Sequence, residues 1–302
     1  MLLLSLGFAH YLANGTMDAS SRHLVAQPRS LGVREIFAGR FAIEEEAGRG
    51  GMGIVYRAFD RVAERTVALK VLRRSGPSAE RRFANEADAL GRIDHPNIVR
   101  YLAHGISEEG EPYLVLEWIE GESLDVRLDR VAATSERLSL YSVLDLGQQL
   151  AGALAAAHAI GIVHRDVKPS NILLVEGDLH RPKLADFGIV RATSETALTT
   201  SGVILGTIGY MAPEQARRAE DLDGRADLFS LGCVLFRCIT DRDVFYGPDP
   251  LAILSMLLVH EPPRVASLRP EVPPELDALV AQLLAKDRDE RPASASQVKE
   301  VL

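Results

Sequence analysis

Two kinds of hydrophobic pattern follow one another along the chain. Between residues 40 and 119 the pattern is one of short runs rich in strand formers, at 40–48, 54–60, 66–72, 99–106 and 112–119. A helical repeat interrupts them at 78–93, where Phe83 and Leu90 recur at helical spacing and Ser78 is a candidate N-cap. Three strands in a row before any helix predict an antiparallel sheet.

The second half of the chain is mainly helical. Apolar or small residues at steps of three and four predict a long buried helix at 142–159. Further helical runs occupy 224–240, 249–260, 275–285 and 294–302, separated by proline-rich loops, and the runs NILLV and PKLAD predict a short hairpin. We interpret 121–123 as a connector between a small lobe at 39–119 and a large lobe at 122–302. Residues 1–38 show neither period and are expected to form a poorly ordered leader.

Composition places the chain among globular proteins. Its 302 residues are 47% hydrophobic and 25% charged, and the formal net charge of −8 argues against a general nucleic-acid binder. The two cysteines, Cys233 and Cys238, are expected to be buried thiols, which indicates a reducing compartment and a cytoplasmic location. The apolar stretch at 1–13 is too short to span a bilayer, and Met17 is a second candidate start site.

The segment HRDVKPSN, from His164 to Asn171, concentrates polar groups between two apolar runs. Asp166, Ser170 and Asn171 are also common turn formers, so a purely local role is one interpretation. The other is a chemical site, which requires partners elsewhere in the chain.

A glycine motif, G-x-G-x-x-G-x-V, runs from Gly48 to Val55 between two predicted strands. A dinucleotide-binding fingerprint opens a helix instead, so a hairpin that covers phosphate groups fits this placement better. A plain glycine hairpin remains the alternative.

Lys70 lies between apolar residues of the third predicted strand, where an ammonium group needs an anion. Nucleotide phosphates and the carboxylate of Glu86, on the following helix, are the two candidates. Alternatively, Lys70 extends to solvent and Glu86 lies on an exposed helix face.

The tripeptide from Asp186 to Gly188 follows the second strand of the predicted hairpin, and Asn171 precedes the first. Their side chains would therefore lie close together and offer the oxygen ligands that Mg²⁺ prefers. Ala212, Pro213 and Glu214 follow, after a loop rich in threonine and serine.

Taken in order, GRGGMG, VALK, Glu86, HRDVKPSN, DFG and APE closely resemble the eukaryotic-type serine/threonine protein kinase family, in its bacterial branch. The resemblance covers about 40–302. It implies an α+β, bilobal protein-kinase fold, with a hinge at 117–121 and ATP in the cleft between the lobes. Leu116 matches the gatekeeper before the hinge. The residues expected to bind ATP are Ala47, Gly48, Arg49, Gly50, Gly51, Met52, Gly53, Val55, Ala68, Lys70, Glu117, Ile119 and Leu173.

The resemblance also assigns catalytic roles. Asp166 would accept or orient the proton of the substrate hydroxyl, and Lys168 would neutralise the transferring phosphoryl group. Lys70, fixed by Glu86, would hold the α- and β-phosphates. Asn171 and Asp186 would carry Mg²⁺, and Thr207 would bridge Asp166 and Lys168.

Regulatory and structural residues follow from the same match. Arg165 implies activation by a phosphate on the threonine-rich loop between the DFG and APE triplets, with Thr199, Thr200 and Ser201 as candidate acceptors and an unmodified loop as the alternative. We expect a structural ion pair between Glu214 and Arg291, an anchor at Asp227 beneath the catalytic loop, and His164 packed on Phe187.

The expected function is therefore transfer of the ATP γ-phosphoryl group to serine or threonine hydroxyls of proteins, with autophosphorylation. An ATP-binding pseudokinase or scaffold is the main alternative, although none of the charged positions is missing. A small-molecule phosphotransferase ranks last, because such enzymes typically lack the APE segment. Partners would be protein substrates and a second copy of the chain, with no nucleic acid. The sequence leaves open whether the chain is a fragment.

Overall fold

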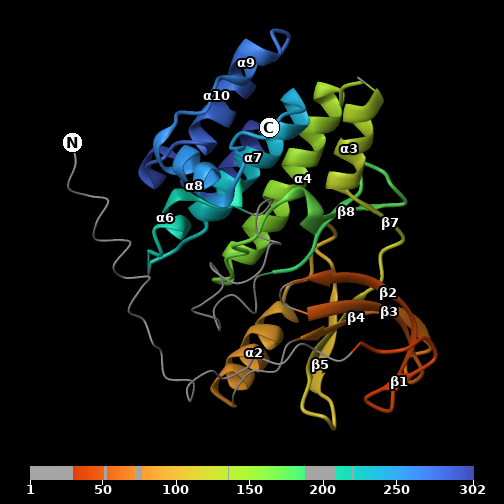
Figure 1. The fold of residues 1–302 in the computed structure, drawn as a ribbon. Coiled ribbons are helices and arrows are strands. Elements are labelled where there is room, and N and C mark those ends of the chain that lie inside the picture. Colours follow the sequence, from red (N-terminus) through yellow and green to blue (C-terminus); the bar gives the residue numbers. More distant parts are fainter. Residues whose placement is uncertain (1–29, 51–52, 73–76, 135, 188–207, 220) are drawn as a thin grey trace, which may run out of the picture.

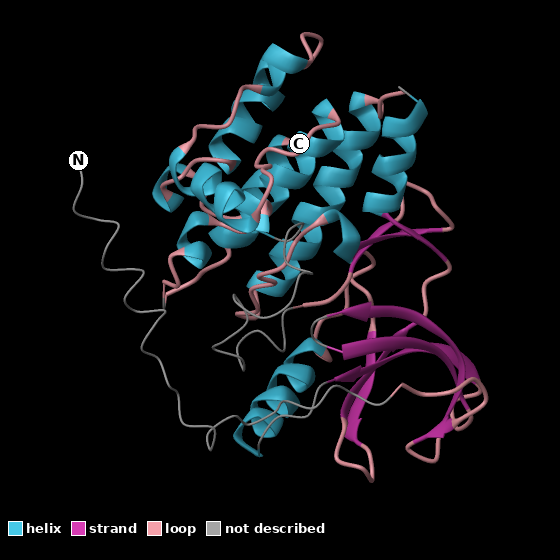
Figure 2. Cartoon of the chain, in the orientation of Figure 1, coloured by secondary structure: helices cyan, strands magenta, loops and turns pink. Residues whose placement is uncertain are grey.

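The computed structural model describes residues 30–50, 53–72, 77–134, 136–187, 208–219 and 221–302. They form two lobes (Figure 1). One lobe contains a curled sheet with helix α2 (Pro77–Leu90) beside it, and the other gathers most of the helices, as the colouring of Figure 2 shows. The predicted α+β, bilobal architecture is confirmed.

The small lobe is built on an antiparallel sheet with the strand order β1-β2-β3-β4-β6-β5. Its strands are β1 (Ile36–Phe37), β2 (Phe41–Gly50), β3 (Gly53–Asp60), β4 (Arg65–Leu72), β5 (Tyr101–Ile106) and β6 (Pro112–Glu117). Each run predicted as a strand between 40 and 119 is present.

Strands β3 and β4 have two distinct faces because side chains alternate along a strand. One face is fully buried in the small-lobe core and carries Ile54, Tyr56, Val67 and Leu69. Val55 and Ala68 are half-buried on the other face, and Lys70 lies directly opposite Val55 in the register. This second face is the one turned toward the large lobe.

Helix α2 begins at Pro77, one residue before the predicted cap at Ser78. Proline fits the first turn of a helix because it lacks the N–H that would have no partner there. Phe83, Ala87 and Leu90 are buried, as their helical spacing predicts. They pack into a core that continues into the large lobe.

The predicted leader ends too late. Residues 36–37 pair with β2, and Leu31 is buried in the small-lobe core. The N–H of Leu31 donates to the Tyr56 hydroxyl at 3.0 Å. Residues 30–38 therefore belong to the small lobe, because one apolar anchor and a two-residue strand fix a segment that is too short to show a period.

The large lobe contains α3 (Leu124–Thr134), α4 (Leu140–His158), α6 (Pro213–Ala216), α7 (Arg225–Thr240), α8 (Pro250–Val259), α9 (Val265–Leu268), α10 (Pro274–Leu283) and α11 (Ala295–Val301). Single 3₁₀ turns, η2 (Pro169–Asn171) and η4 (Arg288–Glu290), occupy two loops. The five predicted helical runs correspond to α4, α7, α8, α10 and α11.

A second, three-stranded sheet has the order β7-β8-β9. The predicted hairpin forms its strands β8 (Ile172–Val175) and β9 (Pro182–Leu184). The predicted connector is wrong: Gly121–Ser123 is strand β7, which pairs with β8. Three residues are too few to show alternation, and their partner lies some fifty positions further along the chain.

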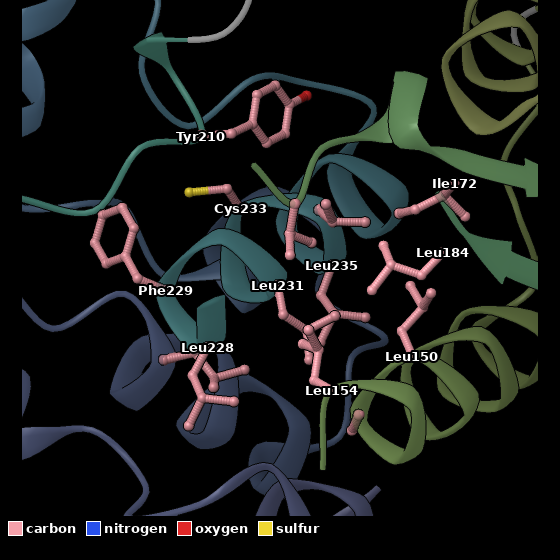
Figure 3. Close-up of a cluster of buried hydrophobic side chains, with 14 of the residues drawn as sticks. Leu150, Leu154, Ile172, Leu184, Tyr210, Leu228, Phe229, Leu231, Cys233 and Leu235 are labelled. Carbon is pink, nitrogen blue, oxygen red and sulfur yellow. The ribbon is translucent and has the colours of Figure 1, made fainter. Parts of the chain in front are cut away.

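Helices α4 and α7 form the centre of the large-lobe core. In Figure 3, Leu231 and Leu235 of α7 lie toward Leu150 and Leu154 of α4, with Ile172 and Leu184 near Leu150. All six are fully buried. Cys233 and Cys238 are buried free thiols, as predicted. Among the described residues, none of the helices combines the length and apolar character needed to cross a bilayer.

Candidate active site

The catalytic-loop segment runs from His164 to Asn171 and enters β8 through the turn η2. Asp166 lies between two polar neighbours. Lys168 Nζ is 3.0 Å from Asp166 Oδ2. The Asn171 amide donates to the Asp166 carbonyl at 2.8 Å and to Asp166 Oδ2 at 3.1 Å. The loop therefore closes on itself around Asp166.

Asp227, near the start of α7, holds this loop from below. Its carboxylate is fully buried and accepts the N–H of His164 at 2.8 Å and the N–H of Arg165 at 2.7 Å. His158, at the end of α4, adds a third contact at 2.8 Å through Nε2. The predicted anchor is confirmed. Arg165 has φ of 64°, a left-handed conformation that a non-glycine residue keeps only when its surroundings impose it.

His164 connects the loop to the segment before Asp186. Its ring is fully buried, with the centroid 4.4 Å from that of Phe187, as predicted. Nε2 lies 2.9 Å from the carbonyl of Ala185, which can only accept, so the proton is on Nε2. Nδ1 then accepts the N–H of Asp166 at 3.2 Å. Burial lowers the pKa of His164, which agrees with this neutral ring.

Lys70 reaches across the cleft to Asp186. Its Nζ donates to Asp186 Oδ1 at 2.7 Å. Burial alone would raise the pKa of Asp186, but the charge and hydrogen bond of Lys70 outweigh it and hold that pKa below its usual value. Lys70 thus has its ion pair with Asp186 here. Its predicted pairing with Glu86, on the inner side of α2, stays a prediction.

Asn171 and Asp186 lie side by side, since the Asn171 carbonyl accepts the N–H of Ala185 at 2.8 Å. The Asn171 amide nitrogen is used by Asp166, which leaves the amide oxygen as an available acceptor. Asp186 is ionised, and 38% of its side chain is exposed. A carboxylate and an amide oxygen at the edge of a cleft fit the donor set of Mg²⁺.

The part of the cleft where ATP is expected is formed by three strands and a hairpin. Val55 and Ala68 are half-buried on the small-lobe sheet, and Leu173 is half-buried on β8. The hairpin between β2 and β3 closes with Gly50 paired to Gly53. A Cβ at Gly53 would overlap the backbone oxygen of Val71 on β4, so the start of β3 requires glycine to pair with β4.

The hinge begins where β6 ends. Glu117 Oε1 accepts the N–H of Arg100 at 2.7 Å and the ammonium of Lys183, on β9, at 2.7 Å. Leu116, in the gatekeeper position, lines a pocket together with Lys70 and Asp186. The predicted gatekeeper is thus next to the charged pair of the site.

Helix α6, which begins with the proline of the APE triplet, is fixed to the base of the large lobe. Arg291 donates to the two carboxylate oxygens of Glu214 at 2.6 and 2.8 Å, and its side chain is fully buried. The predicted structural ion pair is confirmed.

Several predicted residues fall outside the described residues: Gly51, Met52, Thr199, Thr200, Ser201 and Thr207. Of the others in the glycine hairpin, Ala47, Gly48, Arg49 and Gly50 are exposed on β2. The guanidinium of Arg49 bonds to Glu46 and Ser30.

Sequence reasoning missed three residues that bear on the site: His158 beneath Asp227, Lys183 at the hinge, and Gln215. Gln215 donates from its amide to the carbonyl of Arg165 at 3.1 Å. Each acts across 50 or more positions of chain, and no spacing in the sequence indicates such a contact.

A two-lobed fold with a lysine–aspartate pair across the cleft, above a loop that holds Asp166 and Asn171, defines the class of protein kinase domains. The pattern described as "Protein kinase domain" matches residues 41–301, and the chain belongs to this family.

Bacterial serine/threonine-protein kinases are among the relatives of the chain. It is 38% identical over 274 residues to serine/threonine-protein kinase PknJ of Mycobacterium tuberculosis, covering 88% of this chain and 45% of the relative. It is 36% identical over 279 residues to serine/threonine-protein kinase pkn3 of Myxococcus xanthus, covering 88% and 50%. The chain thus spans about half the length of these relatives. The crystal structure of the Mycobacterium tuberculosis PknI kinase domain superposes with a TM-score of 0.69 at 27% identity, covering 90% of this chain and 98% of that one.

Proposed function

We propose that the chain is an ATP-dependent serine/threonine protein kinase that transfers the γ-phosphoryl group of Mg-ATP to protein hydroxyls. The observation that carries this proposal is the charge arrangement of the cleft. Lys70 comes from one lobe and meets Asp186 of the other at 2.7 Å, next to the loop that presents Asp166, Lys168 and Asn171. Phosphoryl transfer depends mainly on positioning and on charge stabilisation, and these residues provide both.

Asp166 is the residue that orients the substrate hydroxyl and takes its proton. Its backbone is held by the His164 ring and by Asn171. Lys168, 3.0 Å from its carboxylate, is placed to balance the negative charge of the phosphoryl group as it moves. Thr207 is proposed to bridge these two residues.

Lys70 would bind the α- and β-phosphates, with Glu86 as its partner on α2. Asn171 and Asp186 would hold Mg²⁺ through their oxygens. A metal held by these oxygens would supply positive charge against the phosphates of the nucleotide. The ammonium of Lys70 would then contact the phosphates as well as Asp186, because Lys70 and Asp186 line the same pocket.

Adenine would lie between Val55 and Ala68 on one side and Leu173 on the other, against the backbone of Glu117 and Ile119. The glycine hairpin, from Ala47 to Gly53, would cover the phosphates. Half-buried apolar side chains on both lobes support this placement, since their exposed surface would be covered by a flat ring.

Regulation by phosphorylation belongs to the same proposal. A phosphate on Thr199, Thr200 or Ser201 would bond to Arg165 and order the loop next to Asp166. The substrates are proteins of unknown identity. The homodimer, the absence of nucleic-acid binding and the cytoplasmic location stay predictions.

The decisive experiment measures phosphate transfer from Mg-ATP to the chain itself and to a generic basic protein. The Asp166→Asn variant should lose about 10²–10⁴ in rate, because the positioned base is gone. Asp241→Asn is the matched control. It makes the same chemical change in the large lobe at φ of 57°, a conformation that asparagine adopts readily. Full activity is expected for it.

Absence of transfer by the unmodified chain, with ATP still bound, would reverse the proposal in favour of an ATP-binding scaffold. The relatives, which are named as kinases, do not support that alternative. Mapping of the labelled residues tests the regulatory part separately, since labelling confined to other positions would remove Thr199, Thr200 and Ser201 from it.

A further inference from the structure

The peptide bond between Arg165 and Asp166 is held at both ends by side chains. Its N–H, from Asp166, donates to Nδ1 of His164 at 3.2 Å. Its carbonyl, from Arg165, accepts the side-chain amide of Gln215 at 3.1 Å. His164 belongs to the loop itself, whereas Gln215 comes from α6. Gln215 is therefore the contact through which another element fixes the orientation of this peptide.

Glutamine is the side chain that satisfies both of its partners here. Its Oε1 accepts the N–H of Ala212 at 3.0 Å, at the start of α6. Glutamate or glutamine at this third helical position commonly makes such a contact. The second partner, the Arg165 carbonyl, needs a donor, and a carboxylate has none. The Gln215 amide thus accepts one hydrogen bond through its oxygen and donates another through its nitrogen. These two partners also determine the orientation of the amide group.

Helix α6 is a rigid support for this contact. Glu214, the neighbour of Gln215, is locked to the buried guanidinium of Arg291. Asp227 fixes the N–H of Arg165 on the other side. Arg165 has a left-handed φ of 64°, which local preference disfavours, so these contacts hold the residue in that state.

We propose that Gln215 is a positioning residue for Asp166. By holding the Arg165 carbonyl, it sets the direction in which the Asp166 carboxylate points. The same contact links α6 to the loop that carries Asp166. This inference rests on the proposed kinase activity. Gln215 itself would touch neither nucleotide nor substrate, so its effect is expected on the chemical step.

The test compares Gln215→Glu with Gln297→Glu. Gln297 occupies the same third position of α11, where its Oε1 accepts the N–H of Ala293 at 3.0 Å. Both variants keep the acceptor for their helix and make the same change of charge, but only Gln215→Glu loses a donor to the catalytic loop. We expect kcat to fall about 10-fold to 10²-fold in Gln215→Glu, because small misplacements of reacting groups cost this much. The KM for Mg-ATP should change by less than about twofold, and Gln297→Glu should match the unmodified chain.

Three further measurements make the result unambiguous. The unmodified chain and Asp166→Asn show whether phosphate transfer occurs at all, so a failure of the proposed function is visible by itself. Thermal unfolding should place the two glutamate variants within about 2 °C of each other. Gln215→Met, uncharged and of similar length, should show the same loss of kcat. Equal kcat for Gln215→Glu and Gln297→Glu would overturn the proposal, and so would a loss of activity that only follows a loss of folded protein.

Discussion

The ion pairs that support the site and the ion pairs that face the cleft use different cations. At the base of the large lobe and in the small lobe, carboxylates are held by arginine, as in Arg291 with Glu214 and Arg40 with Asp60, each through two hydrogen bonds. In the cleft, lysine takes this place, with Lys70 on Asp186 and Lys168 near Asp166.

The difference follows from the shape of the two cations. Guanidinium is planar and matches a carboxylate through two parallel bonds, so its position is fixed. Ammonium is a compact point charge on a flexible stem and can exchange one anion for another. The arginine pairs, which we call the supports, therefore fix the geometry of the parts that they join. The lysines of the cleft can bind a phosphate group as well as a carboxylate. The largest losses of folding free energy should come from the first group, and the largest losses of activity from the second.

The ion pair between Arg291 and Glu214 should give the largest effect on stability. Arg291→Met removes the charge at a side chain that is fully buried and leaves Glu214, 12% exposed, without its counter-ion. Breaking a buried pair from one side costs about 3–5 kcal/mol. Chemical denaturation of the purified chain measures this change in the free energy of unfolding.

Arg288→Met is the control, three positions earlier on η4. Its partner Asp221 is 72% exposed, so the loss should be far smaller than for Arg291→Met. Equal losses in the two variants would mean that burial does not separate supports from surface pairs. A double variant with Glu214→Gln should recover part of the loss, because the isolated carboxylate is then removed.

The second prediction is that the stabilisation by the ion pair of Arg40 with Asp60 depends on pH. Asp60 is 1% exposed and accepts both Arg40 and the N–H groups of Val62 and Ala63. Its hydrogen bond with Arg40 is the main cause that lowers the pKa of Asp60 to about 2. Because the folded pKa lies below the unfolded one, this stabilisation is present above about pH 4 and is lost as the pH falls toward 2. The contribution is about 2 kcal/mol.

Denaturation curves at a series of pH values for the unmodified chain and for Asp60→Asn test it. The difference in the free energy of unfolding between the unmodified chain and Asp60→Asn should shrink by about 2 kcal/mol as the pH falls from 5 to 2. A difference that is constant over this range would show that the Asp60 carboxylate is not what stabilises the small lobe.

The sequence predicts much of the cleft, and it also predicts one of the supports, the ion pair of Arg291 with Glu214, and the anchor at Asp227. The family resemblance predicts Val55, Ala68 and Lys70 together in the cleft, and the structure has them on one face of the small-lobe sheet. Asp166, Asn171 and Asp186 also meet as expected, because the hairpin of β8 and β9 brings its two ends together.

What the sequence leaves out depends on contacts between distant segments. Helix α3 is absent from the sequence prediction, although Leu124, Leu128 and Val131 have helical spacing. The contacts of His158 with Asp227 and of Gln215 with Arg165 are decided by how α4, α6 and α7 pack. Polar side chains in helices are usually solvated, so neither position differs from others in the sequence.

Lys70 is expected to contribute little to stability and much to activity, which makes it the sharpest test of the comparison. Lys70→Met removes the partner of Asp186, but 38% of the Asp186 side chain is exposed and water can take the place of the ammonium. The free energy of unfolding should therefore fall by less than about 1 kcal/mol. Phosphate transfer should fall by at least about 10²-fold, because a charge that stabilises the transferring group is lost. Arg181→Met breaks the surface pair with Glu176 and serves as the control. It should leave phosphate transfer unchanged and change the free energy of unfolding by less than about 0.5 kcal/mol. If Lys70→Met instead costs as much stability as Arg291→Met and its activity falls only with the folded fraction, the lysine of the cleft is a support like the arginines, and the division between the two groups is wrong.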